Sequence, residues 1–274
     1  MLLCRKIESK PKERWRMDYL TRLKLLCVSV GFVIFLVPSR GYSVNIDEIM
    51  KTAAGIWLFD EGKGNKTEDI SGNGNHGELV KNPAWVKGKF GKALEFNGKD
   101  TCVQTGQKLL DNLAEFTIVC WVKTGKITAN RVGLVGQNDS PEFGFIDPGS
   151  VNLWTPKSSL THPWKHGHPS KDWHHIAAVA AKKNLSVYID GEPIEGGGPG
   201  PHGSSNFNVN IGGCGVWDGA GNWFTGAMDE VAIFHSALKD NEVKAIMKDG
   251  FKGMLNVAAR GKLAVRWGDV KHEN

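Results

Sequence analysis

The chain is dominated by short runs in which apolar and polar side chains alternate with a period of two. The clearest example is residues 172–191, where alternating runs cover 174–180 and 185–189. The polar residues 182–184 separate the two runs, and the turn dipeptide Asp190-Gly191 follows the second. This pattern predicts a β-hairpin with an apolar inner face, which needs a second sheet to cover it.

Similar short runs extend along most of the chain. Strand-like segments lie at 54–59, 84–86, 93–96, 101–103, 116–123, 131–136, 142–146, 206–211 and 225–234. By contrast, residues 237–249 carry apolar side chains at helical spacing, and Gly250 is placed as a C-terminal stop. The 34 glycines favour turns over long helices. We therefore predict an all-β protein, a two-sheet antiparallel sandwich with one short C-terminal helix.

Three segments lack any strand or helix periodicity. Residues 67–77 are dense in Gly, Asn, Asp and Ser, which predicts a polar loop. Residues 147–171 are rich in proline and histidine and are predicted as a long loop. The basic tail 251–274 is predicted to be a strap over the sandwich or a frayed end. The predicted organisation is an N-terminal extension with a signal peptide (1–43), one β domain (44–250) and this tail.

The charge of the chain is concentrated at its N-terminus. The net charge is +5, but residues 1–43 alone contribute +6, so the rest of the chain has no basic surplus for binding nucleic acid. Arg22 and Lys24 precede a short apolar run, 25–37, and small residues follow at the alternate positions 41 and 43. This order is typical of a secretory signal peptide cleaved near Ser43, which predicts a secreted or cell-envelope protein. An uncleaved signal segment acting as a membrane anchor is the alternative.

Three of the five cysteines lie beyond the predicted signal peptide: Cys102, Cys120 and Cys214. An odd number in an oxidising compartment allows one disulfide with one spare thiol, but the sequence does not choose the pair. We favour three unpaired thiols. Cys120 lies inside a strand-like run and is predicted to be a small buried residue.

Seven sequence blocks occur together in one order. They are GIWLFDEG (55–62), DISGNGNHG (69–77), KFGKALEFNG (89–98), FTIVCWVK (116–123), WHHIAAV (173–179), VYIDG (187–191) and FTGAMDEVAIFHSAL (224–238). With these blocks, the chain resembles the laminin-G-like jelly-roll domains of the concanavalin A-like lectin/glucanase group over roughly residues 52–250. The resemblance implies two antiparallel jelly-roll sheets, in a module often attached to exported enzymes and adhesins and often using calcium.

Acidic and amide side chains suggest where calcium would bind. If the strands 55–59 and 225–234 are antiparallel neighbours, Asp60 and Asp229 lie close together and repel each other unless a cation lies between them. Oxygen ligands from irregular loops suit calcium. The predicted ligands of a structural calcium are Asp60, Asp69, Asn75, Gly98 (through a main-chain carbonyl) and Asp229. The alternative is that Asp69 and Asn75 cap turns and that Asp229 pairs with a lysine.

Five histidines between 162 and 175 raise the question of zinc. His174 and His175 are adjacent in a strand, so they point to opposite faces. His162, His166 and His168 lie in a Pro/Gly-rich loop with no acidic or cysteine partner nearby in sequence. The sequence therefore does not favour a zinc site.

Catalysis must be considered because glucanases share the fold implied by the resemblance. Glycoside hydrolysis needs two carboxylates on one face, about 5 to 9 Å apart. Asp229 and Glu230 are adjacent and therefore predicted on opposite faces, and no other catalytic motif is present. We predict that the protein is not an enzyme, with a glycoside hydrolase as the least favoured alternative.

Aromatic side chains are the best candidates for ligand contact. Four of the ten tryptophans fall in strand blocks and are predicted to be core residues. The candidates for ligand contact are four tryptophans in predicted loops, where an exposed ring can stack on a sugar: Trp154, Trp164, Trp217 and Trp223. We therefore predict an exported, non-catalytic binding module for a glycan or a glycosylated protein. The alternative is a cell-envelope protein-interaction domain without a sugar site, tethered by its uncleaved signal segment.

Overall fold

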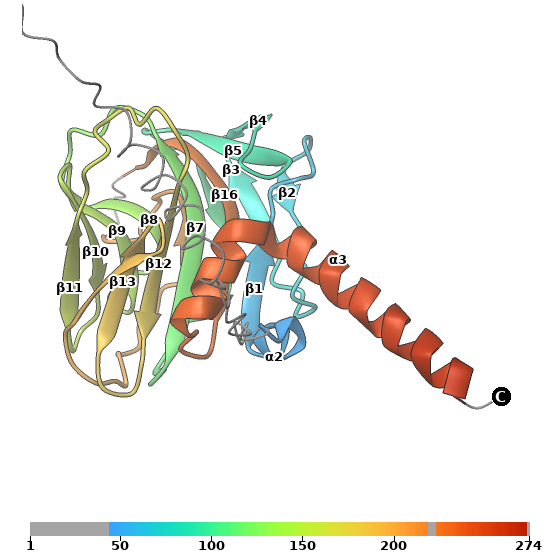
Figure 1. The fold of residues 1–274 in the computed structure, drawn as a ribbon. Helices are drawn as coiled ribbons and strands as arrows, with labels where there is room; N and C mark the ends of the chain where they lie inside the picture. Colours follow the sequence, from blue (N-terminus) through green and yellow to red (C-terminus); the bar gives the residue numbers. More distant parts are fainter. Residues whose placement is uncertain (1–43, 219–222, 273–274) are drawn as a thin grey trace, which may run out of the picture. The chain divides into compact units, whose positions relative to one another are not determined.

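The computed structural model describes residues 44–218 and 223–272, so the predicted signal peptide lies outside the described part of the chain. The described chain forms two antiparallel sheets of eight strands each (Figure 1). Helices α2 (Ile46–Lys51) and α3 (Asp240–His272) precede and follow the strands. The predicted all-β, two-sheet sandwich with a C-terminal helix is confirmed.

One sheet, sheet A, has the strand order β14-β13-β12-β7-β16-β5-β4, and β1 pairs with the second half of β16. Its strands are β1 (Ala53–Trp57), β4 (Ala84–Lys87), β5 (Lys92–Asn97), β7 (Phe116–Thr124), β12 (His174–Ala180), β13 (Leu185–Ile189), β14 (Glu192–Gly196) and β16 (Thr225–Phe234). The other sheet, sheet B, has the order β11-β10-β9-β8-β15-β6-β3-β2. Its strands are β2 (Lys66–Thr67), β3 (Gly77–Val80), β6 (Cys102–Gln104), β8 (Val132–Gln137), β9 (Glu142–Asp147), β10 (Ser150–Trp154), β11 (Ser159–Pro163) and β15 (Val209–Ile211).

The predicted hairpin is confirmed as β12 and β13, with Ala180 opposite Leu185. Ile176 and Ala178 face the core between the two sheets, whereas Ala177 belongs to a second apolar cluster on the opposite face. The central strands of sheet A are therefore buried on both faces. This double burial explains why all seven residues of β12 are buried although its side chains alternate.

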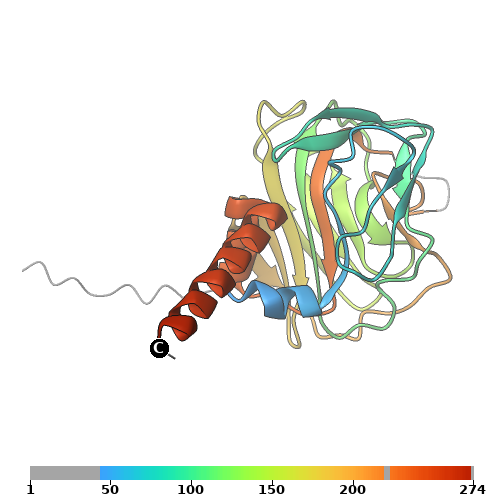
Figure 2. The same ribbon diagram turned by 90° about the vertical axis from the view of Figure 1, so that its right-hand side faces the viewer.

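The second cluster lies where α2 and α3 cover the outer face of sheet A (Figure 2). Ile49 of α2, together with Val243, Ile246 and Phe251 of α3, contributes buried side chains to it. Each helix thus presents an apolar stripe to the sheet, which is the usual way an amphipathic helix is held in a fold. Figure 2 shows both helices on the same side of the sandwich, away from sheet B.

Gly250 interrupts α3 as the sequence predicted. Its backbone is non-helical (φ 61°, ψ 168°), a conformation that glycine adopts readily. The backbone N–H of the next residue, Phe251, donates to the Glu230 carboxylate (2.7 Å). The chain then resumes as helix to His272. Phe251 and Met254 at the start of this segment pack on the outer face of sheet A, as expected of a strap, although the sequence did not predict that the segment is helical. In the described residues, no helix is long and apolar enough to cross a membrane.

The prediction of one long loop at 147–171 is wrong, because β10 and β11 lie within it. In β10, Val151 and Leu153 are buried in the core, but β11 is an edge strand whose side chains are exposed or half-buried. An edge strand of this kind carries little apolar alternation, so its sequence resembles a loop.

A disulfide joins Cys102 to Cys214, so the expectation of three unpaired thiols is wrong. The two cysteines are 112 residues apart in the sequence, and only the folding of residues 212–218 against sheet B brings them together. Cys120 is a buried free thiol, as predicted.

Candidate functional site

The outer face of sheet B carries a row of side chains that crosses five strands. The strand register places Gln104 opposite Asn210, Asn210 opposite Gly136, Gly136 opposite Glu142, and Glu142 opposite Trp154. In each strand the neighbouring residues belong to the core, so this row points away from sheet A. Neighbouring strands lie about 4.8 Å apart, so the members of the row are adjacent to one another across the sheet.

Residues 212–218, which we call the disulfide loop, fold over the middle of this face. The side chain of Val216 fills the space above Gly133 and Gly136, where a Cβ atom would collide with it. The Cys102–Cys214 disulfide fixes the loop to β6, and Asn210 Nδ2 donates to the carbonyl of Cys214 (2.8 Å). The loop therefore divides the outer face into two parts.

On the β6 and β15 side of this loop lies a concave site of about 330 Å³, which we call the amide pocket. It is lined by Gln104, Gly106, Asn206, Phe207, Asn208, Asn210, Cys214 and Gly215. Phe207 is 42% exposed and is one of the few large apolar side chains exposed in the described chain. The site thus combines an exposed aromatic ring with four side-chain amides, each of which has both donors and an acceptor.

Glu142 lies on the other side of the disulfide loop and is buried. Its Oε1 accepts a hydrogen bond from the backbone N–H of Asp139 (2.8 Å). Burial, together with the charges of Asp139 and Asp218, raises the pKa of Glu142 to about 8, against the lowering effect of the Asp139 hydrogen bond and Arg131. At neutral pH this carboxyl is therefore mostly protonated and can donate a hydrogen bond.

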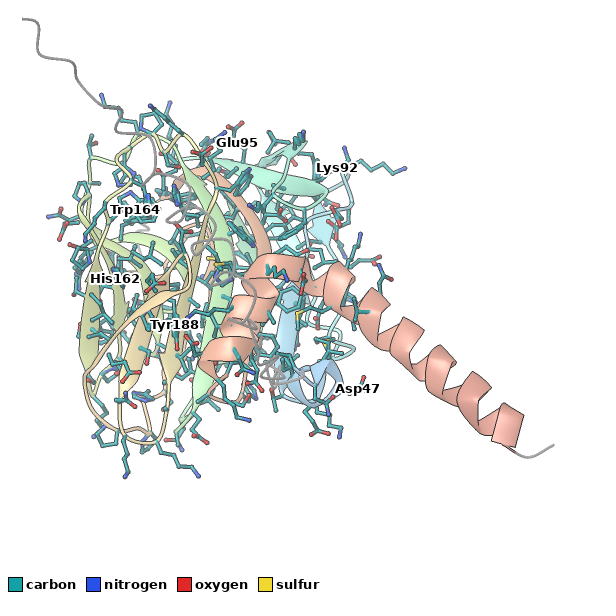
Figure 3. The ribbon with its side chains drawn as sticks, in the orientation of Figure 1. Asp47, Lys92, Glu95, His162, Trp164 and Tyr188 are labelled. Carbon is teal, nitrogen blue, oxygen red and sulfur yellow. A yellow bond between two sulfur atoms is a disulfide. The ribbon has the colours of Figure 1, made fainter. Side chains whose placement is uncertain are left out.

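The four predicted ligand tryptophans do not form one exposed group. Trp154 is half-buried on the outer face of sheet B, and Trp223 is half-buried in the segment before β16. Trp217 is buried in the disulfide loop, and Trp164 is buried against the core on the β11 side of the sandwich (Figure 3). The prediction that the rings of Trp217 and Trp164 are exposed is therefore wrong. Ligand binding by Trp154 and Trp223 stays a prediction.

Sequence reasoning missed Phe207 and the amides around it. The run 206–211 was predicted as a strand, but only Val209–Ile211 is β15, which leaves Asn206, Phe207 and Asn208 in the loop before it. The available signal was a single aromatic residue between two asparagines after a Gly/Ser-rich segment. Its meaning depends on the partner strand β6, which lies about a hundred residues away in sequence.

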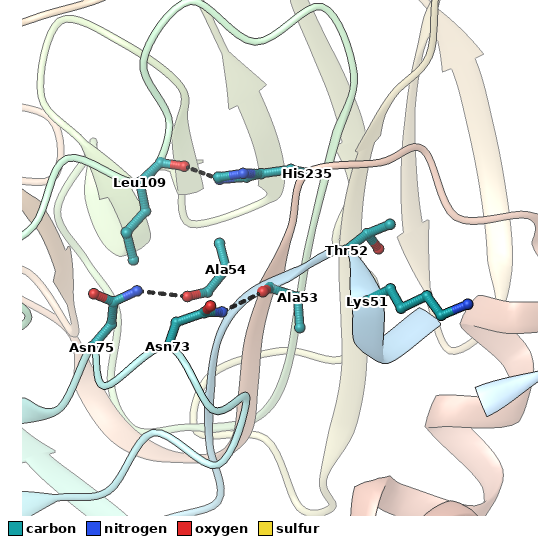
Figure 4. A pocket seen from close by; sticks show the side chains of 8 residues that line it. All are labelled: Lys51, Thr52, Ala53, Ala54, Asn73, Asn75, Leu109 and His235. Carbon is teal, nitrogen blue, oxygen red and sulfur yellow. Dashed lines mark hydrogen bonds between the residues drawn. The ribbon is translucent and has the colours of Figure 1, made fainter. Parts of the chain in front are cut away.

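A second pocket, of about 520 Å³, lies beside the edge strand β1 (Figure 4). Its lining residues are Lys51, Thr52, Ala53, Ala54, Asn73, Asn75, Leu109 and His235. Asn73 Nδ2 donates to the Ala53 carbonyl and Asn75 Nδ2 to the Ala54 carbonyl, both at 2.7 Å. These amides hold the loop 67–77 against the edge of β1. We therefore assign them a structural role.

Asp69, one of the predicted calcium ligands, holds the same loop by hydrogen bonds. Its Oδ1 accepts from the backbone N–H groups of Ile56 (2.9 Å) and Ser71 (2.8 Å). Its Oδ2 accepts from the Ser71 hydroxyl (2.8 Å) and the Asn75 N–H (2.9 Å). The turn-capping alternative for Asp69 is therefore the arrangement that the structure shows.

Asp60 and Asp229 lie near each other, because β1 and β16 are antiparallel neighbours as assumed. Asp60 accepts from the backbone N–H of Lys92 (2.7 Å) and pairs with the Lys252 ammonium (2.6 Å). Asp229 Oδ2 accepts from the N–H of Phe90 (2.9 Å), and its Oδ1 is buried without a hydrogen-bond partner. The lysine predicted for Asp229 is thus found on Asp60.

The five predicted calcium ligands lie in three places. Asp60 and Asp229 form one, Asp69 and Asn75 hold the loop beside β1, and Gly98 lies in the turn between β5 and β6, against Thr225. The five residues do not surround one calcium ion, because they lie in three different places of the fold. Most of their side-chain oxygens already accept hydrogen bonds or pair with an ammonium group there. Calcium binding stays a prediction, for Asp60 and Asp229 alone.

A β-bulge places Asp229 and Glu230 on the same face of sheet A. Glu230 has φ 51°, and the register of β16 shifts between Asp229 and Ala232. The prediction of opposite faces is therefore wrong. Burial raises the pKa of Asp229 to about 8 and that of Glu230 to about 7. Both side chains are buried at the helix-covered face, so this acid pair does not line an open groove.

The histidine-rich segment does have an acidic partner, in contrast to the prediction. His174 Nδ1 lies 2.7 Å from Asp190 Oδ2, and His166 Nε2 lies 3.4 Å from the same oxygen. Asp190 belongs to the turn after β13. Because β12 and β13 are antiparallel, this turn lies beside the start of β12. His174 and His175 point to opposite faces as predicted, since the ring of His175 packs on Trp121 at the outer face of sheet A.

Residues 97–244, more than half of the chain, match the sequence pattern of the concanavalin A-like lectin/glucanases superfamily. The chain belongs to this superfamily. No curated protein matches the chain. The two-sheet architecture is therefore a laminin-G-like jelly roll, as the sequence blocks predicted.

Solved structures show the same fold. Domain 4 of AbnA, an extracellular GH43 arabinanase from Geobacillus stearothermophilus in complex with arabinotriose, is similar at 20% identity with a TM-score of 0.55, covering 71% of this chain and 98% of that one. The binding domain of Paraclostridial Mosquitocidal Protein 1 is similar at 17% identity (TM-score 0.52), covering 72% of this chain and 52% of that one.

Botulinum neurotoxin type C, whose passage into cells is dependent upon interaction with two ganglioside molecules, is similar at 13% identity. Its TM-score is 0.51, and the match covers 74% of this chain and 52% of that one. The chain thus spans nearly all of the arabinanase domain but about half the length of the toxin chains. At these identities the similarity shows the fold.

Proposed function

We propose that this superfamily member is a non-catalytic module that binds a glycan or a glycosylated protein in the amide pocket. The observation that carries the proposal is Phe207, an exposed ring in a concave site among the amides of Gln104, Asn206, Asn208 and Asn210. Aromatic rings and a few convergent polar groups are what a small-ligand site usually offers.

The chemistry of the pocket matches that of a sugar. Each sugar hydroxyl donates and accepts hydrogen bonds, and so does each side-chain amide. The apolar C–H face of a pyranose or furanose ring packs on an aromatic ring. The volume of about 330 Å³ is at the lower end of the range for ligand sites, roughly 300–1,000 Å³, and suits a short oligosaccharide segment.

The comparisons support the same ligand class. One similar structure holds arabinotriose, and another belongs to a toxin that interacts with gangliosides. These ligands are those of the similar proteins. For this chain they support a carbohydrate without choosing which one.

Binding without hydrolysis is supported by the state of the acidic residues. Asp229 and Glu230 share a face, but they are buried at the helix-covered side and accept hydrogen bonds from backbone N–H groups. A glycosidase needs its two carboxyls to line an open groove, where they flank the sugar bond that is cleaved. A hydrolase is therefore less favoured than a binding module.

Export remains part of the proposal. The Cys102–Cys214 disulfide supports an oxidising compartment, in agreement with the signal peptide predicted in residues 1–43. The alternative of a cell-envelope protein tethered by an uncleaved signal segment shares this expectation. It differs in having no sugar ligand.

A glycan array with the full chain tests the proposal. Wild type is expected to bind one group of related oligosaccharides, and Phe207→Ala to lose about 10-fold in affinity, equivalent to about 1.4 kcal/mol. Ile194→Ala is the matched control, since Ile194 is similarly exposed (37%) on β14 of the other sheet. Retained binding in Phe207→Ala would contradict the site. If no glycan binds and the protein is recovered with membranes, the tethered interaction domain is favoured. Release of reducing sugar from a bound oligosaccharide would contradict the non-catalytic assignment.

A further inference from the structure

Three separate parts of the chain meet at one rim of the sandwich. His166 comes from the turn after β11, His174 from the start of β12, and Asp190 from the turn after β13. One ligand atom from each of these residues lies within 4.8 Å of the others. In the described residues, this is the group of His, Cys, Asp and Glu side chains whose spacing suits a metal ion.

The distances are close to those around a tetrahedral ion. Asp190 Oδ2 lies 2.7 Å from His174 Nδ1 and 3.4 Å from His166 Nε2. Zinc binds imidazole nitrogen and carboxylate oxygen at about 2.0–2.2 Å, which places neighbouring ligand atoms roughly 3.4 Å apart. In this structure the two imidazole rings stack with their centroids 3.7 Å apart. An ion would therefore replace the His174–Asp190 hydrogen bond, and the His166 ring, on its partly exposed turn, would rotate so that its nitrogen faces the ion.

Asp190 is held in position for this role. Its other oxygen, Oδ1, accepts a hydrogen bond from the His175 backbone N–H (2.9 Å), and its own N–H donates to the His175 carbonyl (2.8 Å). These two bonds fix the carboxylate so that Oδ2 faces both imidazoles. Ordered second partners of this kind are what metal-binding carboxylates usually have.

The histidine rings are positioned by Trp164. Its ring contacts both imidazoles edge-on, with centroid distances of 4.9 Å to His166 and 5.2 Å to His174. Trp164 Nε1 donates to the Gly167 carbonyl (3.1 Å), which closes the turn that carries His166. His168 anchors the end of this turn through Thr124 and Pro148. Buried Trp164 therefore has a structural role, because it holds the turn 164–168 over β12.

The donor set selects the class of metal. Two imidazole nitrogens and one carboxylate oxygen suit zinc and its neighbours in the first transition series rather than calcium or magnesium. The side chains of His166 and Asp190 are 33% and 37% exposed, so a fourth position opens to solvent. We propose that His166, His174 and Asp190 form a Zn²⁺ site that ties the turn 164–168 to the β12–β13 hairpin.

Zinc titration of the full chain, followed by calorimetry and thermal unfolding, tests this site. The variant is His166→Ala, which removes one ligand from a partly exposed turn. The matched control is His162→Ala, since His162 is a half-buried histidine on the preceding strand β11 and is not one of the three ligands. Asp190→Asn is a second variant that keeps the acceptor for the His175 N–H. Circular dichroism of each variant without metal checks that it is folded.

Wild type and His162→Ala are expected to bind one Zn²⁺ that His166→Ala and Asp190→Asn do not bind. At 100-fold excess over Kd, zinc should raise their Tm by roughly 5–10 °C, and calcium should not. Cobalt in place of zinc should give the visible absorption of a four-coordinate ion in wild type and not in His166→Ala. Equal zinc binding by wild type and His166→Ala, or no binding by wild type, would overturn the proposal. In that case the three side chains form only an ion pair.

Discussion

The two outer faces of the sandwich carry similar cross-strand rows of polar and aromatic side chains. The row on sheet A is buried, whereas the row on sheet B is partly open to solvent. On sheet A, His175 lies opposite Trp121, and Trp121 opposite Asp229. All three are buried, and each has a side-chain nitrogen or oxygen atom without a hydrogen-bond partner. On sheet B, the row that includes Gln104 and Asn210 ends in an open pocket of side-chain amides.

The difference between the two faces lies in what covers each of them. The helices add an apolar layer to sheet A, and burial lowers the pKa of His175 to about 3, so that its ring stays neutral. Sheet B has the disulfide loop in place of a helix, which leaves polar groups within reach of a ligand. Polar side chains therefore have different roles on the two faces, although both faces belong to the same pair of sheets.

The largest contrast is expected between two Phe→Ala substitutions. Phe251 of α3 is fully buried against the outer face of sheet A and packs near Phe234, with ring centroids 6.1 Å apart. Phe251→Ala should lower the free energy of unfolding by about 3–5 kcal/mol, whereas Phe207→Ala should change it by less than about 0.5 kcal/mol. Urea unfolding of both variants measures this contrast. A similar loss of unfolding free energy in the two variants would contradict the contrast between a buried face of sheet A and an open face of sheet B.

The next effect concerns the disulfide that shapes the open face. The double variant Cys102→Ser/Cys214→Ser should lose about 2–4 kcal/mol of stability and also bind glycan more weakly, because Cys214 lines the amide pocket. Thermal unfolding and the array measure the two effects. Cys120→Ala is the matched control, since it removes a buried thiol and keeps the disulfide. Unchanged glycan affinity in the folded double variant would show that the loop does not form part of the site.

A smaller effect is expected from the pH dependence of the covered face. The folded-state pKa values of Asp229 (about 8) and Glu230 (about 7) are raised above their unfolded values. Their contribution is therefore fully present below the unfolded pKa values and is lost as the pH rises through the folded ones. Between pH 6.5 and 8 the free energy of unfolding should fall, by at most about 1.4 kcal/mol per pH unit for each carboxyl, and then level off.

Urea unfolding from pH 6.5 to 9 measures this slope in wild type and in Asp229→Asn/Glu230→Gln. The double variant should show a much flatter dependence, with a residual part from Glu142 on the other sheet. Glu142→Gln is the control that removes only this residual part. A slope in the double variant as steep as that of wild type would contradict the assigned pKa values.

The sequence was sufficient to predict the architecture because the core strands alternate strongly and are bounded by turn residues. Edge strands such as β11 were missed because their side chains are largely exposed and show no apolar period. The Cys102–Cys214 pair was missed for a different reason. It depends on a contact between segments 112 residues apart, which no local pattern reports.

The candidate sites were harder to predict, because each depends on local backbone geometry or on distant strands. The side-chain alternation that places neighbours on opposite faces fails at Glu230, where a residue with positive φ forms a bulge. Asp190 was not recognised as the partner of His166 because 24 positions of sequence and a hairpin separate them. The pocket that contains Phe207 exists only because β15 lies beside β6.

Glycan binding is proposed for the amide pocket on the outer face of sheet B. A crystal structure of the chain with the strongest oligosaccharide from the array measures this most directly. A sugar ring is expected to pack on Phe207, with its hydroxyls hydrogen-bonded to Asn206, Asn208 or Gln104. A sugar bound in the pocket beside β1, against Asn73 and Asn75, or at the rim near Trp164 would contradict it.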